Sequence, residues 1–349
     1  MRELPQKILV IRLSSIGDII LTSPFLRILR KKVGDNARID FAIKKEFSEL
    51  VKSSHHISVV HELDTSVGFK GLKELKEKIQ IEKYDLIVDL QNNLRSIYVR
   101  NLIGVSDVVS VNKMIWERIQ LVYFKKNIYP KIFPVSKRYI STLQEYGIED
   151  DGKGLEIFIP DEIQFGIASK IATLKLKNYE KTIALCPGAK HNTKRWQKEK
   201  FAELGIKLAN EFHAKIILFG DKNDESICSE ISKTINNAIP NSCTDYSGQF
   251  TILQTAAAIE FCDVVVSNDS ALMHIAAAKQ KPVVAIFGST VKEFGFIPFQ
   301  TIFTIVERND VPCRPCSHIG KANCPKDHFN CMNLISTEEV FVEIKNILS

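Results

Sequence analysis

The sequence predicts an α/β protein of two doubly wound, Rossmann-like domains facing a cleft, and three observations lead to this prediction. The chain has 349 residues, too many for one ordinary core. Short apolar runs rich in Ile and Val alternate with segments of helical spacing, a pattern typical of a parallel sheet covered by helices. The alternation starts again after Pro160. We therefore expect domains at 1–160 and 161–335, followed by a C-terminal helix at 336–349.

The first half contains apolar runs that fit buried strands and amphipathic segments that fit helices. The expected strands are Lys7–Leu13, Arg38–Ile43, Ser58–His61 and Asp85–Asp89. The expected helices are Asp18–Lys32, Glu46–Lys52, Lys70–Ile79, Leu94–Ile103 and Ser136–Tyr146.

The second half repeats this pattern. The expected strands are Thr182–Cys186, Lys215–Phe219, Asp263–Ser267 and Pro282–Phe287. The expected helices are Lys198–Phe212, Asp224–Ile235, Ile252–Glu260, Ala271–Ala278 and Thr337–Leu348, and the last of these is expected to pack back on the first domain. Ligands of such folds sit beyond the carboxyl ends of the strands, in the crevice between domains.

The net charge of +6 is unevenly placed along the chain. Gln91–Ile140 holds nine basic residues and two acidic ones, whereas residues 161–349 are balanced. This favours either an anionic partner for the first half or a basic solvated surface. The basic residues are dispersed and no nucleic-acid motif accompanies them, so nucleic acid is not expected as a partner. No apolar run is long enough for a membrane span or a signal peptide, which predicts a cytoplasmic location.

The first strand-to-helix turn places Asp18 at a helix start, after Ser15 and Gly17. One interpretation is a helix cap. The other is a carboxylate at the ligand edge of the sheet that acts as a general base. A G-x-G-x-x-G fingerprint is missing from this turn, which argues against a nicotinamide oxidoreductase.

The strand Asp263–Ser267 runs into a helix with small residues at its start. Ser270 and Ala271 are expected to present unbonded backbone N–H groups at the positive end of the helix dipole, which predicts an anion site. Asp269 fits a cap or a ligand for a ribose hydroxyl. His274 lies one turn further along the same face, and a core histidine is the alternative.

The loop Pro187–Trp196 follows a buried strand and carries basic residues. Lys194 or Arg195 fits a cation that neutralises a diphosphate leaving group. A merely solvated basic loop is the alternative.

The eight cysteines all follow residue 185. Cys186, Cys228, Cys243 and Cys262 lie on apolar segments and fit reduced core residues. The others, Cys313, Cys316, Cys324 and Cys331, follow the pattern C-x2-C-x7-C-x6-C, which fits either a structural zinc site or free cysteines. A catalytic thiol is not expected, because no base stands near these cysteines in the sequence.

Four segments together resemble the bacterial heptosyltransferases of glycosyltransferase family 9, which build the lipopolysaccharide inner core. They are Lys7–Asp18, Pro187–Trp196, Val266–Ala278 and Phe287–Thr290. The resemblance implies a GT-B arrangement, with ADP-heptose on the C-terminal domain and the acceptor on the N-terminal one. It also implies a peripheral position at the inner face of the inner membrane.

The resemblance assigns roles to individual residues. It implies that Asp18 is the catalytic base. The implied donor-binding residues are Thr193, Lys194, Glu225 near the ribose or base, Phe250 against adenine, Asp269, Ser270, Ala271 and His274. The family usually has glycine where this chain has Ala271, so the methyl group is expected to crowd the phosphate slightly.

The expected reaction is an inverting transfer of heptose to an anionic lipopolysaccharide-core acceptor that needs no metal or cofactor. Asp18 takes the acceptor proton, while the helix start and Lys194 hold the departing diphosphate. The expected acceptor-binding residues are Ser15, Asn93, Arg95, Lys113, Arg118, Lys137 and Arg138. The alternatives are a transferase for another nucleotide sugar and a non-catalytic sugar-nucleotide-binding protein.

Overall fold

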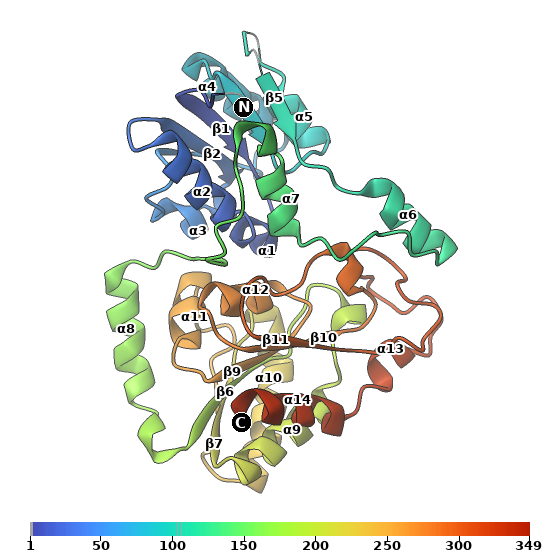
Figure 1. Ribbon diagram of the computed structural model, residues 1–349. Coiled ribbons are helices and arrows are strands. Elements are labelled where there is room, and N and C mark those ends of the chain that lie inside the picture. Colours follow the sequence, from blue (N-terminus) through green and yellow to red (C-terminus); the bar gives the residue numbers. More distant parts are fainter. Residues whose placement is uncertain (1–2, 103, 106) are drawn as a thin grey trace. The chain divides into compact units, whose positions relative to one another are not determined.

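The computed structural model describes residues 3–102, 104–105 and 107–349, which form two compact units (Figure 1). Unit 1 comprises Met1–Ile115 and Phe133–Phe158, and unit 2 comprises Trp116–Ile132 and Ile159–Ser349. Within the described residues, no helix combines the length and the apolar character that crossing a membrane requires.

Unit 1 is a parallel sheet in the order β3-β2-β1-β4-β5. Its strands are β1 (Lys7–Ile11), β2 (Arg38–Lys44), β3 (Val59–Leu63), β4 (Leu86–Asp89) and β5 (Asp107–Ser110). Its helices are α1 (Ile16–Ile20), α2 (Ser23–Val33), α3 (Glu49–Lys52), α4 (Phe69–Glu82), α5 (Leu94–Arg100) and α7 (Val135–Ser141). Leu9, Ile11 and Ile87 are fully buried in its core because both faces of a parallel sheet are covered.

Unit 2 is a larger parallel sheet in the order β11-β10-β9-β6-β7-β8. Its strands are β6 (Lys181–Cys186), β7 (Ala214–Leu218), β8 (Cys243–Asp245), β9 (Val264–Asn268), β10 (Val283–Phe287) and β11 (Phe303–Glu307). Its helices are α8 (Asp161–Ala172), α9 (Lys198–Glu211), α10 (Glu225–Ala238), α11 (Ile252–Ile259), α12 (Ala271–Ala278), α13 (Asn330–Asn333) and α14 (Thr337–Leu348).

The expectation of two Rossmann-like α/β domains is confirmed. In each sheet the chain starts at an inner strand, builds outward on one side, and then returns to build the other side. The two inner strands are β1 and β4 in unit 1, and β6 and β9 in unit 2. Loops diverge at the carboxyl ends of such a strand pair, which leaves room for a ligand there.

Several expected elements end elsewhere in the structure. The helix expected at Asp18–Lys32 is divided into α1 and α2, because Pro24 fits only the first turn of a helix. The helix expected at Leu94–Ile103 ends at Arg100, and Ile103 lies outside the described residues. Helix α14 packs against α9, β9, β10 and β11, all of which belong to unit 2.

One excursion of the chain was not expected. Trp116–Ile132 belongs to unit 2, although the residues on either side of it belong to unit 1. It carries α6 (Ile115–Phe124), whose Leu121 packs with Val291 and Phe294. Apolar contacts with residues about 170 positions further along the chain therefore hold this segment.

Candidate active site

In unit 2, the expected anion-binding segments follow the two inner strands. The loop Pro187–Trp196 follows β6, and the start of α12 follows β9. Because β6 and β9 are neighbours in the sheet, their carboxyl ends bring this loop and this helix start together.

The buried side chain of Asn268, the last residue of β9, holds both ends of that loop. Its amide nitrogen donates to the carbonyl of Pro187 at 2.7 Å, and its amide oxygen accepts from the backbone N–H of Trp196 at 3.1 Å. Asn268 is fully buried. One side chain thus fixes the path of the loop that carries Lys194, a role that the sequence did not suggest.

Thr193 is a buried residue that supports the loop from inside. It is 1% exposed. Its hydroxyl accepts from Ser289 Oγ at 3.0 Å and from the backbone N–H of Lys321 at 2.7 Å. These neighbours hold the hydroxyl and cover it.

Lys194 and Asp269 form an ion pair beside the start of α12. Nζ of Lys194 lies 2.7 Å from Oδ2 of Asp269, which also accepts from Thr290 Oγ1 at 2.6 Å. Asp269 is 6% exposed. The Asp269 carboxylate would repel a phosphate by itself, but this lysine and this hydroxyl offset its charge.

The start of α12 has the features of an anion site. Ser270 occupies the N-cap without a side-chain hydrogen bond to the helix. Ser270 and Ala271 are both partly exposed. Ala271 is the first helical residue, a right-handed conformation that alanine adopts without strain, so the backbone here does not require glycine. His274 lies one turn further and is 3% exposed.

Arg195 points to a different neighbour. Its guanidinium donates to the carbonyl of Ala189 at 2.7 Å and to Asp224 at 3.2 Å. Burial raises the pKa of Asp224, and the nearby charge of Asp221 raises it further. Of the two cations that the sequence left open, Lys194 is therefore the one beside the helix start.

The loop has a positive electrostatic environment. His191 is partly buried, and burial together with the charges of Lys194 and Lys190 lowers its pKa. Burial and these two lysines thus favour the neutral form of the imidazole.

The residues expected near the nucleoside lie further along the same sheet edge. Glu225 begins α10 and lies so close to Gly248 that a Cβ there would be 1.9 Å from its Oε1. Phe250 stacks on Tyr246 with ring centroids 4.6 Å apart, and Lys170 Nζ lies 4.7 Å from its centroid. Tyr246 and Lys170 therefore belong to the surroundings of Phe250, which the sequence did not indicate.

In unit 1, Asp18 lies just beyond the carboxyl end of β1. It is the third residue of α1, and Ser15 is the N-cap. Oδ2 of Asp18 accepts from Ser15 Oγ at 2.8 Å, and Oδ1 lies 2.5 Å from a guanidinium nitrogen of Arg12. Asp18 thus supports the helix start, yet its side chain remains 16% exposed.

A tyrosine distant in sequence completes the surroundings of Asp18. Tyr139 of α7 donates its hydroxyl to Oδ1 of Asp18 at 3.4 Å. Burial raises the pKa of Tyr139, and Asp18 raises it further, so the phenol keeps its proton. Arg12 and Tyr139 were not predicted as site residues, and no sequence pattern links Tyr139 to the first turn.

The end of β4 lies next to this turn. The backbone N–H of Ser14 donates to Gln91 Oε1 at 3.1 Å. Asn93 caps α5, Arg95 is exposed in its first turn, and Lys113 Nζ donates to the carbonyl of Asn92 at 3.1 Å. The edge of unit 1 at the carboxyl ends of its strands, called the ligand edge below, thus carries Ser15, Asn93, Arg95 and Lys113.

The remaining acceptor candidates lie elsewhere. Arg118 belongs to unit 2 and is partly exposed. Arg138 is buried and donates to the carbonyl of Phe133 at 3.0 Å. Lys137 pairs with Asp150 at 3.4 Å and is 43% exposed. Arg118 and Lys137 are therefore accessible to a ligand, whereas Arg138 is enclosed.

The cysteine cluster lies in the chain between β11 and α14. Sγ of Cys313 lies 3.7 Å from Nε2 of His328, and Cys331 is buried. Across residues 3–102, 104–105 and 107–349, no three His, Cys, Asp or Glu side chains are arranged to hold a metal ion. All eight cysteines are free thiols.

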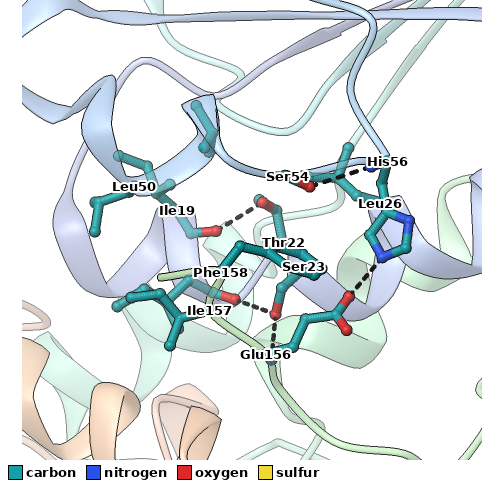
Figure 2. Close-up of a pocket in the computed structure, with 12 residues that line it drawn as sticks. Ile19, Thr22, Ser23, Leu26, Leu50, Ser54, His56, Glu156, Ile157 and Phe158 are labelled. Carbon is teal, nitrogen blue, oxygen red and sulfur yellow. Dashed lines mark hydrogen bonds and ion pairs between the residues drawn. The ribbon is translucent and has the colours of Figure 1, made fainter. Parts of the chain in front are cut away.

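A small cavity in unit 1 is lined by residues of α1, α2, α3 and the segment 156–158 (Figure 2). Its volume is about 20 Å³, room for about one water molecule. His56 Nε2 lies 2.9 Å from Glu156 Oε1, and the backbone N–H of Glu156 donates to Ser23 Oγ at 3.0 Å (Figure 2). This cavity is too small for a sugar and is therefore not the substrate site.

Two heptosyltransferases are similar to this chain over most of its length. A lipooligosaccharide heptosyltransferase 2 of Campylobacter jejuni is 26% identical over 339 residues, 95% of each chain. A lipopolysaccharide heptosyltransferase 2 of Escherichia coli is 26% identical over 300 residues, 82% of this chain and 84% of the other.

Solved structures show the same fold. A glycosyltransferase of family 9 from Veillonella parvula matches with a TM-score of 0.80 at 21% identity, over 99% of this chain and 98% of the other. The ADP-heptose lipopolysaccharide heptosyltransferase II of E. coli matches with a TM-score of 0.71 at 22% identity, over 98% of each chain. These likenesses identify the fold as GT-B. Residues 72–326 match the family described as glycosyltransferase family 9 (heptosyltransferase), and the chain therefore belongs to that family.

Proposed function

We propose that this glycosyltransferase moves a heptose from ADP-heptose to an acceptor in the lipopolysaccharide inner core, with inversion at the anomeric carbon. The observation that carries the proposal is the match over 95% of the chain to a relative named as a heptosyltransferase of this kind. Side chains and backbone groups at the two sheet edges, described above, support it.

The donor diphosphate would bind at the start of α12. The backbone N–H groups of Ser270 and Ala271 lie at the positive end of the helix dipole, and Lys194 stands beside them. When the anomeric carbon–oxygen bond breaks, its electron pair and negative charge stay on the departing diphosphate. A fixed cation and backbone donors stabilise that charge more than they stabilise the bound substrate.

Asp18 would act on the acceptor. Its carboxylate takes the proton of the attacking hydroxyl as the new bond to the anomeric carbon forms. Arg12 and the Tyr139 hydroxyl hold this carboxylate in place. In this scheme the helix start and Lys194 hold the leaving group, so we propose that transfer needs no metal ion.

The acceptor would lie along the ligand edge of unit 1. Arg95, Lys113 and Lys137 are basic residues suited to the phosphates or carboxylates of an inner-core acceptor. Such an acceptor is anchored in a bilayer by its lipid, so the protein would work as a peripheral protein at the inner face of the inner membrane.

The test combines a donor screen with a base variant. Thermal stabilisation is measured with ADP, UDP and GDP. Transfer is measured with ADP-heptose and lipopolysaccharide acceptors that carry either no heptose or one heptose, with and without a chelator. We expect ADP to stabilise most, and Asp18→Asn to bind ADP normally but lose transfer. A preference for UDP would remove ADP-heptose as donor, retained transfer in Asp18→Asn would remove Asp18 as base, and chelator-sensitive transfer would remove the metal-free scheme.

A further inference from the structure

Helix α6 presents an unusual set of exposed side chains. Trp116 is 63% exposed, Tyr123 is 76% exposed and Phe124 is 68% exposed. Folded proteins bury most aromatic side chains because each removes a large apolar area from water. Three exposed aromatic residues on a ten-residue helix therefore indicate a surface that something covers.

The two faces of α6 are clearly different. Leu121 is buried and packs with Val291 and Phe294, and the partly buried Val122 joins them. Trp116 and Tyr123 are seven residues apart, which is two helical turns, and thus lie on one face. That face points away from Leu121, so unit 2 uses one side of the helix and leaves the aromatic side outside.

The segment is held firmly in unit 2. Besides the contacts of Leu121, Tyr129 packs in the same cluster, and Lys125 Nζ donates to the carbonyl of Pro315 at 2.7 Å. These contacts hold the helix that carries the aromatic face in place on unit 2. Helix α6 is labelled in the teal-to-green part of the chain in Figure 1.

The charge of this segment selects the kind of partner. Residues 116–132 contain Arg118, Lys125, Lys126 and Lys131, against a single acid, Glu117. Lysines are depleted in protein–protein interfaces, whereas Lys with Trp and Tyr is the combination found where proteins meet lipid headgroups. Lysine also attracts anionic lipid.

We infer that α6 docks on an anionic phospholipid bilayer through Trp116 and Tyr123 of its outer face, together with the exposed Phe124 and Lys126 at and just beyond its C-terminal end. The aromatic rings enter the headgroup region, and the lysine stays in water beside the lipid phosphates. This adds a docking surface to the proposed function. Because vesicle binding needs no donor or acceptor, the inference and the proposed function can fail separately.

The chain offers a built-in probe for the test. It contains two tryptophans, Trp116 and Trp196. Trp196 is 2% exposed and donates its indole N–H to the carbonyl of Ile335 at 3.1 Å. Quenching of fluorescence by brominated lipids therefore reports the insertion of Trp116.

The experiment measures co-sedimentation with phosphatidylcholine vesicles that contain or lack phosphatidylglycerol. We expect binding to the anionic vesicles, weakened by salt, with quenching of Trp116. The triple variant Trp116→Ala, Tyr123→Ala, Phe124→Ala should bind at least about tenfold more weakly. Lys126→Gln should cost about fivefold. The matched control is Phe165→Ala on α8, an aromatic residue 70% exposed, which should change nothing.

Three outcomes would overturn the inference. The first is equal binding of the triple variant and the wild type, and the second is binding without quenching of Trp116. The third is self-association in solution that the triple variant abolishes while vesicles are ignored, which would make the face a contact between copies. Circular dichroism verifies that each variant is folded.

Discussion

The ammonium group of Lys194 lies 2.7 Å from the carboxylate of Asp269, at the start of α12. The lysine comes from the loop after β6 and the aspartate from the end of β9. Their pairing keeps a cation beside backbone donors before any ligand arrives. Preorganisation of this kind lowers the cost of orienting charges during a reaction.

Lys194→Ala should lower kcat for transfer by roughly a hundredfold, the usual effect of removing one group that stabilises developing negative charge. Steady-state kinetics with ADP-heptose measure it. The matched control is Lys190→Ala, because Lys190 lies in the same loop, is exposed, and is not placed beside the helix start. Equal losses in the two variants would assign the effect to the general charge of the loop.

The Asn268 side chain holds both ends of that loop, so its removal should affect both stability and donor binding. Asn268→Ala leaves the carbonyl of Pro187 and the N–H of Trp196 without their buried partner. Each such group costs about 1–3 kcal/mol. Denaturant unfolding should show that loss, and ADP should bind more weakly. Asn223→Ala, at an exposed asparagine, is the control. An unchanged ADP affinity would limit Asn268 to stability.

The strands of both sheets could be predicted from the sequence because buried parallel strands are continuous apolar runs, as in Val264–Ser267. The strands β5, β8 and β11 were missed, since three residues at β8 carry little pattern and both β5 and β11 are partly exposed. Asp18, Lys194 and Ser270 stand out because each follows an inner strand. Tyr139 and Asn268 do not, because their partners are distant in the sequence. Tyr139 is 121 positions from Asp18, and Asn268 is 72 positions from Trp196 and 81 positions from Pro187.

Arg12 should act as a positioning residue for Asp18. Arg12→Gln removes the guanidinium that lies 2.5 Å from the carboxylate, while unit 2 keeps its anion site. We expect kcat to fall by about tenfold or more with an unchanged ADP affinity, because misplacing a reacting group slows the chemical step. Arg12→Lys, which keeps the charge, should recover part of the rate. A raised KM for the donor with normal kcat would contradict this role.

Asp151 should contribute a pH-dependent part of the stability of unit 1. Arg27 donates to it at 2.9 and 2.8 Å, and these bonds hold the pKa of Asp151 below its usual 3.8. A depressed carboxyl pKa gives stability that is present above the unfolded pKa and lost as pH falls through the folded one. Asp151→Asn should therefore cost about 1–3 kcal/mol at pH 7 and less at pH 3, which lies below the usual pKa of 3.8. Unfolding by urea at both pH values measures this, and an equal cost at both would contradict it.

The cysteines should react with a thiol reagent in two classes. Cys313, Cys316 and Cys324 are partly exposed, whereas Cys186, Cys228, Cys243, Cys262 and Cys331 are buried. Burial raises the pKa of Cys262 and of Cys331 to about 12, which leaves almost no reactive thiolate at pH 8. The cysteines of the first class should thus react in the native protein, and those of the second class should react only after unfolding. If the first class reacts slowly in the native protein and a chelator restores its reaction, a bound metal would be indicated instead, because thiolates that ligate zinc react slowly. Cys313→Ser, which lowers the native count by one, serves as the control.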